Sequence, residues 1–349
     1  MQPELALYID SARWYTHLDG VLRQHPGQIV PVAKGNGYGL TNEFLASVSR
    51  QLGVDAIAVG TIEEARRVLP HFAGLVLVLR PHSPGDDIGS LPSRVVFHAA
   101  SPQALEDLQN RRVIVQCASS LYDGGMDLDE LEGLLPLFEE GVVDGFSLSL
   151  PLERHGGGRQ LTEIAAWIEW LRNAEVKPLR VYVNHVSDAE INALRTWYPD
   201  TDVRARLGTR LWLGDTSSFR IAGTVIAVES VPRGRRFGYR QRRARADMSI
   251  VTAVGGTAHG VGLQAPKLVR GRERFRTMTR AGMAAFNLHM SPFSWDGRRL
   301  WFAEPPHMSV SMLIVPDGIE PPVPGDLLPL RLRYTTTRFD RVEVGVHAD

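Results

Sequence analysis

The chain has 349 residues, 44% of them hydrophobic, and its 39 Lys+Arg balance its 39 Asp+Glu. At about 150 residues per domain, this length predicts two domains, although one α/β barrel can use roughly 200–250 residues. The apolar content and the formal net charge of +0 argue against a disordered or polycationic chain, and therefore against nucleic acid as a partner.

Cysteine use and hydropathy indicate the compartment. The single cysteine, Cys117, cannot form an intrachain disulfide. No run approaches the roughly 20 apolar residues of a membrane span, and the segment Met1–Glu4 lacks the basic and apolar regions of a signal peptide. We therefore expect a cytoplasmic protein without a membrane partner.

The first part of the chain, residues 1–216, alternates apolar β-rich runs with amphipathic stretches, the pattern of βα units around a parallel sheet. Capping boxes at Thr61–Glu64 and Ser187–Glu190 predict two helix starts. Eight runs with few charges are predicted as strands buried on both faces: 28–33, 56–60, 74–80, 94–99, 112–117, 144–151, 178–185 and 203–213. This α/β pattern predicts a (β/α)8 barrel, with a doubly wound open sheet as the alternative.

The second part, residues 217–349, has a different character. Strands are predicted at 221–231, 247–254, 310–316 and 327–334, with Gly and Pro between them and little helical periodicity. About 130 residues are ample for an independent core. We therefore expect a mostly β C-terminal domain.

Lysine is scarce in this chain, since only Lys34, Lys177 and Lys267 are present. Lys34 follows the first predicted barrel strand, within the segment VAKGNGYG at 32–39, and barrel active sites form at this strand end. A desolvated lysine amine can condense with a carbonyl, as it does with pyridoxal phosphate (PLP), and a nearby tyrosine can bind the cofactor phosphate. The alternative is a lysine that reaches solvent beside a glycine-rich turn.

The segment Val32–Gly39 resembles the V-K-A-N-A-Y-G signature of the alanine racemase family of fold-type III PLP enzymes, with glycine in place of the family's two alanines. The resemblance implies that PLP is bound as an aldimine on Lys34 and that Tyr38 contacts its phosphate. The stretch Leu5–Leu22 is similar to the family's opening, which implies that a strand at about 4–10 pairs with the β domain.

Two further segments resemble family motifs in the barrel. Leu150–Gly156 resembles D-T-G-M-x-R-x-G, which implies that Arg154 hydrogen-bonds the ring oxygen of the cofactor. Val183–Val186 resembles the T-H-F/L segment, which implies that His185 lies beside the pyridine ring in a hydrogen-bond chain. A loop arginine and a structural histidine are the alternatives.

Arg206–Gly214 resembles the family's R-P-G-I-x-L-Y-G motif. The resemblance implies that Arg206 faces the pyridine nitrogen, and that the backbone N–H groups of Gly208 and Thr209 bind the phosphate. Tyr334 resembles the family tyrosine that also contacts the phosphate. A fixed cation at the pyridine nitrogen keeps it unprotonated, which suits proton exchange at Cα better than transamination.

One catalytic element of the family is missing. Gly256–Gly260 reads GTAHG where the family has G-Y-A-D-G, so Thr257 replaces the tyrosine that the partner subunit supplies as the second acid/base. An unactivated alcohol is too weak an acid for this role. His259 lies two residues on and is the candidate substitute, with a loop histidine as the alternative.

The resemblance therefore implies a PLP-dependent isomerase, an amino-acid racemase-like protein that acts at Cα of a small-molecule amino-acid substrate with Lys34 as one base and His185 supporting the hydrogen-bond network. His259 is the candidate for the second catalytic base. The resemblance also implies a homodimer with shared active sites, and no metal. Two alternatives remain open. One is a lyase or decarboxylase on the same fold, and the other is a non-catalytic PLP-binding homologue.

Overall fold

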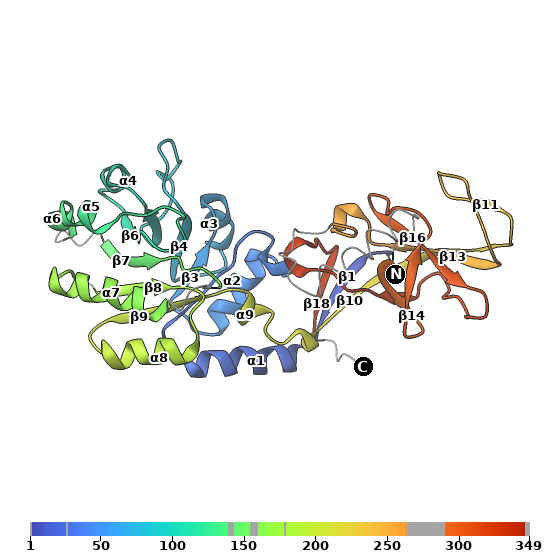
Figure 1. Ribbon diagram of the computed structural model, residues 1–349, viewed down its shortest axis with the longest axis horizontal. Helices are drawn as coiled ribbons and strands as arrows, with labels where there is room; N and C mark the ends of the chain where they lie inside the picture. The colour runs from blue at the N-terminus through green and yellow to red at the C-terminus, as the bar shows by residue number, and fades with distance from the viewer. Residues whose placement is uncertain are drawn as a thin grey trace. The chain divides into compact units, whose positions relative to one another are not determined.

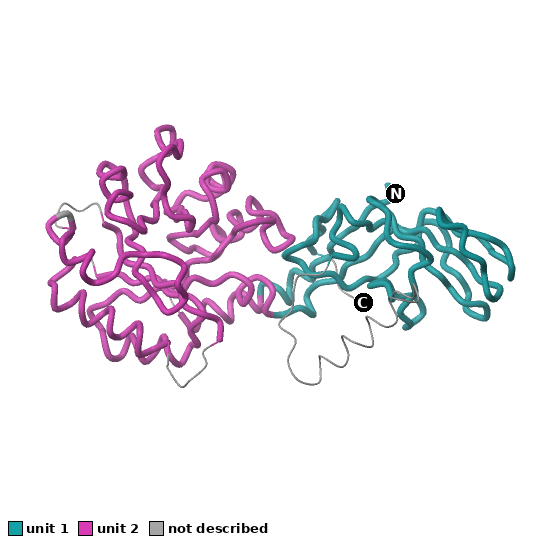
Figure 2. Tube along the Cα trace, turned by 45° about the horizontal axis from the view of Figure 1, so that its top comes forward, with its two compact units in different colours: residues 1–15, 215–349 teal, residues 16–214 magenta. Residues whose placement is uncertain are grey.

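The computed structural model describes residues 2–25, 27–138, 143–153, 160–177, 179–263 and 290–345. The chain forms two compact units (Figure 2). The barrel unit is Thr16–Gly214, and the β unit combines Met1–Tyr15 with Asp215–Asp349. No helix of the described segments is long and apolar enough to cross a membrane.

The barrel unit is built on eight parallel strands, which Figure 1 shows with their helices. They run in the order β2-β9-β8-β7-β6-β5-β4-β3, and a parallel bridge between Val32 and Ala58 joins the two ends of this order. The strands are β2 (Ile29–Pro31), β3 (Ala56–Val59), β4 (Leu75–Pro81), β5 (Val95–Ala99), β6 (Arg112–Cys117), β7 (Val143–Leu148), β8 (Arg180–Val183) and β9 (Asp202–Leu207). The predicted barrel is confirmed, and the open sheet is wrong.

The helices follow the strands in α/β fashion. They are α1 (Ser11–Gln24), α2 (Asn42–Gln51), α3 (Ile62–Val68), α4 (Pro102–Asp107), α5 (Leu128–Glu132), α6 (Leu135–Phe138), α7 (Gln160–Asn173), α8 (Asp188–Trp197) and α9 (Thr209–Trp212). The capping box at Ser187 is confirmed. The one at Thr61 is only half right, because the Thr61 side chain accepts from Glu64 N while the Glu64 carboxylate bonds elsewhere.

The last predicted barrel strand, 203–213, is too long. β9 ends at Leu207, the chain turns at Gly208, and α9 begins at Thr209. The apolar residues Leu211 and Trp212 are buried in this short helix, and Trp212 Nε1 donates to Val32 O at 2.8 Å. A short apolar run satisfies a buried helix as well as a buried strand, which explains the error.

The barrel interior has two layers that position the site. Near the amino-terminal end, a polar network joins Asp144 to Arg112, Arg180 and Tyr182. Above it lies an apolar layer formed by Val30, Val32, Ala56, Ala58, Leu77, Val96, Ile114 and Tyr182. Active sites of α/β barrels form at the opposite, carboxyl-terminal end, beyond such a packed layer.

The β unit is a sheet in the order β14-β15-β16-β13-β10-β1-β18, with β17 also on β10. Its strands are β1 (Leu5–Ile9), β10 (Phe219–Val231), β13 (Met248–Val254), β14 (Met290–Trp295), β15 (Arg298–Phe302), β16 (Val310–Pro316), β17 (Leu327–Pro329) and β18 (Arg341–Val344), with a separate hairpin of β11 (Arg236–Phe237) and β12 (Arg242–Arg243). The N-terminal strand β1 runs antiparallel to β10, with Leu5 opposite Gly223. The mostly β character is confirmed.

In the β unit, one predicted strand is too long and one hairpin was missed. The strand predicted at 327–334 ends at Pro329, because Tyr334 begins a short 3-10 turn. The hairpin of β14 and β15 was not predicted, since Pro292 interrupts the strand pattern. Its turn, Asp296-Gly297, is a strong hairpin signal, and both residues have a positive φ.

Candidate active site

Lys34 lies on a tight turn beyond the carboxyl end of β2. The strand is continued to the turn by a hydrogen bond from Ala33 N–H to Ala58 O at 2.7 Å, and Lys34 O accepts from Gly37 N–H at 3.1 Å. Gly37 has a φ of +62°, and a Cβ there would lie 2.6 Å from Asn42 N. The Lys34 side chain is exposed. The glycine-rich turn therefore fixes the backbone of the lysine and leaves its side chain accessible to solvent.

Glu64 clamps this turn from the start of α3. Its Oε1 accepts from Gly35 N–H at 2.9 Å, and its Oε2 accepts from Gly60 N–H at 2.6 Å. The residue is buried. A Cβ at Gly60 would lie 3.3 Å from Lys34 Cβ, so the β3 end and the lysine are in close contact. The carboxylate thus ties the Lys34 turn to the neighbouring strand of the barrel.

Tyr38 connects the lysine turn to the end of β9. It is buried, has a φ of +58°, and burial raises the pKa of its hydroxyl to about 12. A Cβ at Gly208 would overlap the Tyr38 hydroxyl, so only glycine permits this approach. Thr209, the first residue of α9, is exposed beside it in sequence. The structure therefore brings Lys34, Tyr38 and the Gly208–Thr209 backbone to the ends of two adjacent strands.

Arg206 points into the barrel from β9, since it lies opposite Val30 of the apolar layer. One guanidinium nitrogen, Nη2, donates to Leu148 O at 2.9 Å. The Nε atom is buried and has no partner within the described residues. Burial lowers the pKa of Arg206 to about 10, and the charge of Asp123 opposes this shift. The side chain therefore stays cationic at neutral pH.

His98 and Ser147 add two more unpaired polar atoms to this interior. His98 lies two residues after Val96 of the apolar layer, on the same face of β5. Its Nδ1 donates to Val78 O at 2.7 Å, which leaves Nε2 as an acceptor without a partner in the described chain. Burial lowers the pKa of His98 to about 3, so the ring is neutral. Ser147 Oγ on β7 is likewise buried and unpaired there.

Two predicted barrel residues remain, and no contact joins either of them to Lys34, Tyr38 or Arg206 within the described residues. His185 is exposed, has a φ of +53°, and donates from Nδ1 to Leu150 O at 2.8 Å. Arg154 lies outside the described residues. The sequence reasoning missed His98, for which the only signal is a histidine within the apolar strand VVFHA.

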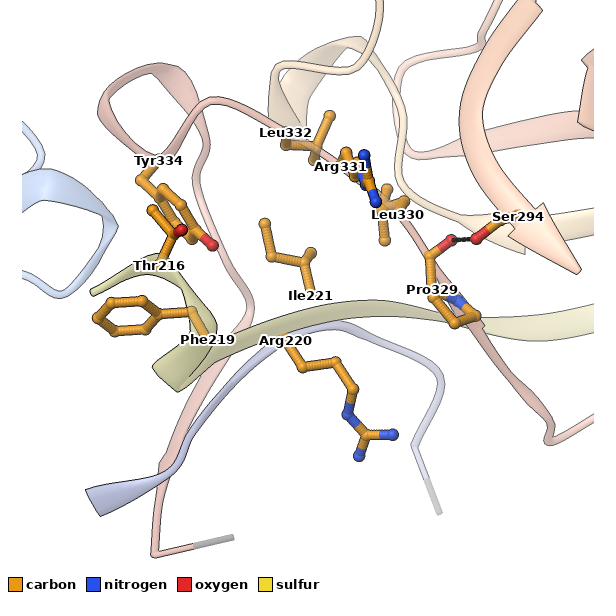
Figure 3. Close-up of a pocket in the computed structure, with 10 residues that line it drawn as sticks. All are labelled: Thr216, Phe219, Arg220, Ile221, Ser294, Pro329, Leu330, Arg331, Leu332 and Tyr334. Atoms are coloured by element: carbon orange, nitrogen blue, oxygen red, sulfur yellow. Dashed lines mark hydrogen bonds between the residues drawn. The ribbon is translucent and has the colours of Figure 1, made fainter. Parts of the chain in front are cut away.

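In the β unit, Tyr334 lines a cavity of about 660 Å³ (Figure 3). Its ring centroid lies 5.5 Å from that of Phe219, and burial raises the pKa of its hydroxyl. Figure 3 shows Tyr334 and Thr216 at one end of this cavity and Ile221 between them and Pro329. The cavity is lined by apolar side chains and by polar ones, among them Arg220 and Arg331, and all its lining residues belong to the β unit.

The GTAHG loop, residues 256–260, in which we expected the second acid/base, is also in the β unit. Thr257 is exposed, and its N–H donates to His307 O at 2.8 Å. His259 is buried, its Nδ1 accepts from Gly256 N–H at 3.1 Å, and its Nε2 lies 3.2 Å from Asp340 Oδ2. Both ring nitrogens of His259 are therefore occupied by contacts within the unit.

An eight-stranded parallel barrel with a lysine at the end of its first strand, followed in the same chain by a β unit, is the architecture that the motifs led us to expect. The family described as alanine racemase, N-terminal domain, matches residues 9–189, more than half of the chain. The chain therefore belongs to the alanine racemase family. A search of curated protein sequences finds no match.

Solved structures share the fold at low sequence identity. Alanine racemase from Bacillus anthracis with bound L-Ala-P has a TM-score of 0.72 at 18% identity, covering 95% of this chain and 86% of its own. Alanine racemase from Bartonella henselae with covalently bound pyridoxal phosphate has 0.69 at 17%, covering 95% and 92%. Histidine racemase from Leuconostoc mesenteroides has 0.68 at 14%, covering 98% of each chain.

Proposed function

We propose that this protein is a PLP-dependent isomerase, an amino-acid racemase-like enzyme in which Lys34 holds the cofactor. The observation that carries the proposal is the placement of Lys34 and Gly208 beyond the ends of β2 and β9. These two strands are paired, with Pro31 opposite Leu207. Tyr38 spans the two strand ends, since it follows the lysine turn and packs against Gly208. The relatives solved with PLP or with L-Ala-P support this cofactor and this substrate class.

The residues present fit PLP. The Tyr38 hydroxyl lies against Gly208, so a phenol and the Gly208–Thr209 backbone lie together at the end of β9, where they would hold the phosphate. Arg206 carries a buried Nε without a partner among the described residues, and we assign its guanidinium to the pyridine nitrogen. When bound, PLP withdraws electrons from Cα of the amino acid and so makes the Cα proton acidic. Arg154, His185 and Tyr334 complete the proposed cofactor contacts.

Lys34 and Arg206 define the reaction that this chain favours. The Lys34 amine, when released from the cofactor, would remove or return the Cα proton on one face of the substrate. Arg206 remains cationic, and a cation at the pyridine nitrogen disfavours protonation of that nitrogen. This environment favours proton exchange at Cα over transamination.

A second candidate function is supported by Thr257. The residue is exposed and carries no group strong enough for proton transfer near neutral pH, and both ring nitrogens of His259 are engaged. A lyase or decarboxylase needs an acid/base on one face only, and a non-catalytic PLP-binding homologue needs none. Product analysis with several amino acids distinguishes these reactions from racemisation.

The proposal includes a cytoplasmic homodimer with shared active sites. It is supported by the family resemblance, in which one subunit's β domain completes the partner's barrel site. Sedimentation of the purified protein should give a dimer, and a monomer that retains full activity would contradict shared sites. Mixing an inactive Lys34 variant with an inactive β-unit variant should restore activity in the mixed dimer.

The test of cofactor attachment is borohydride reduction of the protein with PLP, followed by mass spectrometry. We expect one reduced adduct, on Lys34, and none in Lys34→Ala. Lys177→Ala is a matched control, because Lys177 is an exposed lysine of the same unit. An adduct on another lysine, or no adduct in the unmodified protein, would refute the proposed function.

A further inference from the structure

A carboxylate and an imidazole form a pair in the β unit, outside all the motifs used above. Glu304 is buried, and its Oε1 accepts from His307 Nε2 at 2.6 Å. Its Oε2 accepts from Tyr239 N–H at 2.8 Å. Gly238 has a φ of +69°, and a Cβ there would lie 2.5 Å from Glu304 Oε2. The loop thus wraps closely around the carboxylate, which holds the histidine by one ring nitrogen.

The contact with Glu304 fixes the tautomer of His307. Because Nε2 donates to a carboxylate, it carries the ring proton, and Nδ1 presents its lone pair. No described residue hydrogen-bonds this Nδ1, and about a quarter of the side chain, 27%, is exposed. The Tyr239 ring lies against the imidazole, with centroids 4.9 Å apart. A histidine oriented by a carboxylate, with its other nitrogen accessible, is the arrangement of a general acid/base.

His307 adjoins the loop in which an acid/base is missing. Thr257 N–H donates to His307 O at 2.8 Å, and Ala258 N–H donates to Met308 O at 2.9 Å. A Cβ at Gly256 would overlap the carbonyl oxygens of both His307 and Met308, so the two segments are in direct contact. Thr257 and the His307 pair are therefore neighbours on one part of the β unit.

We propose that His307, oriented by Glu304, is the acid/base that the β unit supplies in place of the missing tyrosine. The inference rests on the proposed function. In the proposed homodimer, His307 Nδ1 would accept the Cα proton on the face opposite the partner subunit's Lys34, and the electron pair of the broken C–H bond would stay on the substrate. The resulting imidazolium would be stabilised by Glu304 through Nε2–H. In the reverse step, Nδ1–H would return the proton to Cα on the same face.

His307→Gln in the PLP-loaded enzyme tests this role. We expect racemisation to fall about 10²–10⁴-fold, the usual contribution of one positioned proton carrier. The loss must be equal in both directions, because the two enantiomers have equal free energy. Exchange of the Cα proton with solvent deuterium should persist for the one enantiomer that Lys34 deprotonates. His71→Gln is the control, since the His71 side chain makes no hydrogen bond within the described residues.

A second measurement uses the protein without cofactor. In ¹⁵N-histidine NMR spectra, His307 should appear as the Nε2–H tautomer, and Glu304→Gln should change its signals while leaving those of His71 in place. Glu304→Gln should also lower racemisation with the adduct on Lys34 intact, which covers the case in which His307→Gln does not fold.

The outcomes separate the two proposals. If the unmodified protein forms no adduct on Lys34, the proposed function fails. If the adduct forms but His307→Gln racemises as fast as the unmodified enzyme, or if His307 is the Nδ1–H tautomer, only the assignment of His307 is overturned.

Discussion

The two ends of the barrel interior differ in whether their buried polar side chains have hydrogen-bond partners. At the amino-terminal end, the buried Asp144 carboxylate accepts from Tyr182 at 2.8 Å and from Arg112 and Arg180. Among the side chains that point into the barrel near the carboxyl-terminal end, His98 Nε2, Ser147 Oγ and Arg206 Nε are buried and have no partner within the described residues. An unpaired buried polar atom costs about 1–3 kcal/mol. The paired end stabilises the barrel, whereas the unpaired end leaves hydrogen-bonding capacity for a ligand.

The largest effect should come from Lys34→Ala at the carboxyl-terminal end. We expect racemisation to fall by more than about 10⁴-fold, the upper range for one proton carrier, because Lys34 is also the residue that we propose to hold the cofactor. Its exposed side chain makes the melting temperature of the cofactor-free protein insensitive to the change. Enzyme assays and thermal melts measure both. Residual racemisation close to that of Lys177→Ala would place the chemistry elsewhere.

Asp144→Asn, at the amino-terminal end, should lower the stability of the protein and leave cofactor attachment intact. The variant leaves Arg112 and Arg180 without their shared carboxylate, and breaking a buried ion pair costs roughly 3–5 kcal/mol. Because Arg112 and Arg180 are partly exposed, we expect a loss of about 2–4 kcal/mol in the free energy of unfolding. Urea titration measures this loss, and the borohydride adduct on Lys34 should still form. Loss of the adduct in a folded Asp144→Asn protein would show that the two ends are not independent.

Gly208→Ala tests the close approach of the Tyr38 hydroxyl to Gly208 at the carboxyl-terminal end. The new Cβ would overlap the Tyr38 hydroxyl, and overpacking costs about 1–3 kcal/mol. Tyr38→Phe removes the hydroxyl, so the double variant should recover part of the lost stability. If the two changes are additive in denaturant titrations, Tyr38 does not lie against Gly208. Gly133→Ala is a control, since a Cβ there meets nothing closer than 3.7 Å.

Glu64→Gln should weaken the Lys34 turn without removing any catalytic group. A glutamine side chain has one carbonyl oxygen and cannot accept from both Gly35 and Gly60, so one N–H loses its partner. We expect about 1–2 kcal/mol of destabilisation and PLP affinity reduced by about tenfold, which corresponds to about 1.4 kcal/mol. Fluorescence titration with PLP measures the affinity. Unchanged affinity would mean that the clamp does not position the lysine.

These contacts show where sequence reasoning succeeded and where it ended. The strands predicted at 112–117 and 310–316 match β6 and β16, because both segments are rich in β-branched and other apolar residues. Glu64 has the spacing of a capping box, but its carboxylate accepts from Gly60 in its own loop and from Gly35 in the Lys34 turn. Its role depends on tertiary neighbours that no local spacing encodes.

The site residues also divide into those that motifs predicted and those that only the structure shows. Lys34, Tyr38, Arg206 and Gly208 were predicted because they stand in motifs, and the fold brings them to adjacent strand ends. His98 belongs to no motif, and its inward direction follows only from the register of β5 beside Val96. Glu304 and His307 are three residues apart in an irregular segment, where no periodicity indicates that their side chains meet.

Lowering the pH should give the smallest of the effects that distinguish the two ends of the barrel. Burial opposes ionisation of Asp144, but hydrogen bonds from Tyr182 and Arg112 and the charges of Arg112 and Arg180 outweigh it and lower the pKa. A carboxyl whose folded pKa is depressed contributes stability above its unfolded pKa of about 3.9, and this stability is lost as pH falls through the folded value. The free energy of unfolding should therefore drop below about pH 4 by about 1.4 kcal/mol per unit of difference between the two pKa values. Asp144→Asn should show a smaller drop between pH 5 and pH 2, whereas Lys34→Ala should follow the unmodified protein. Equal acid dependence in all three proteins would assign the effect to other carboxylates.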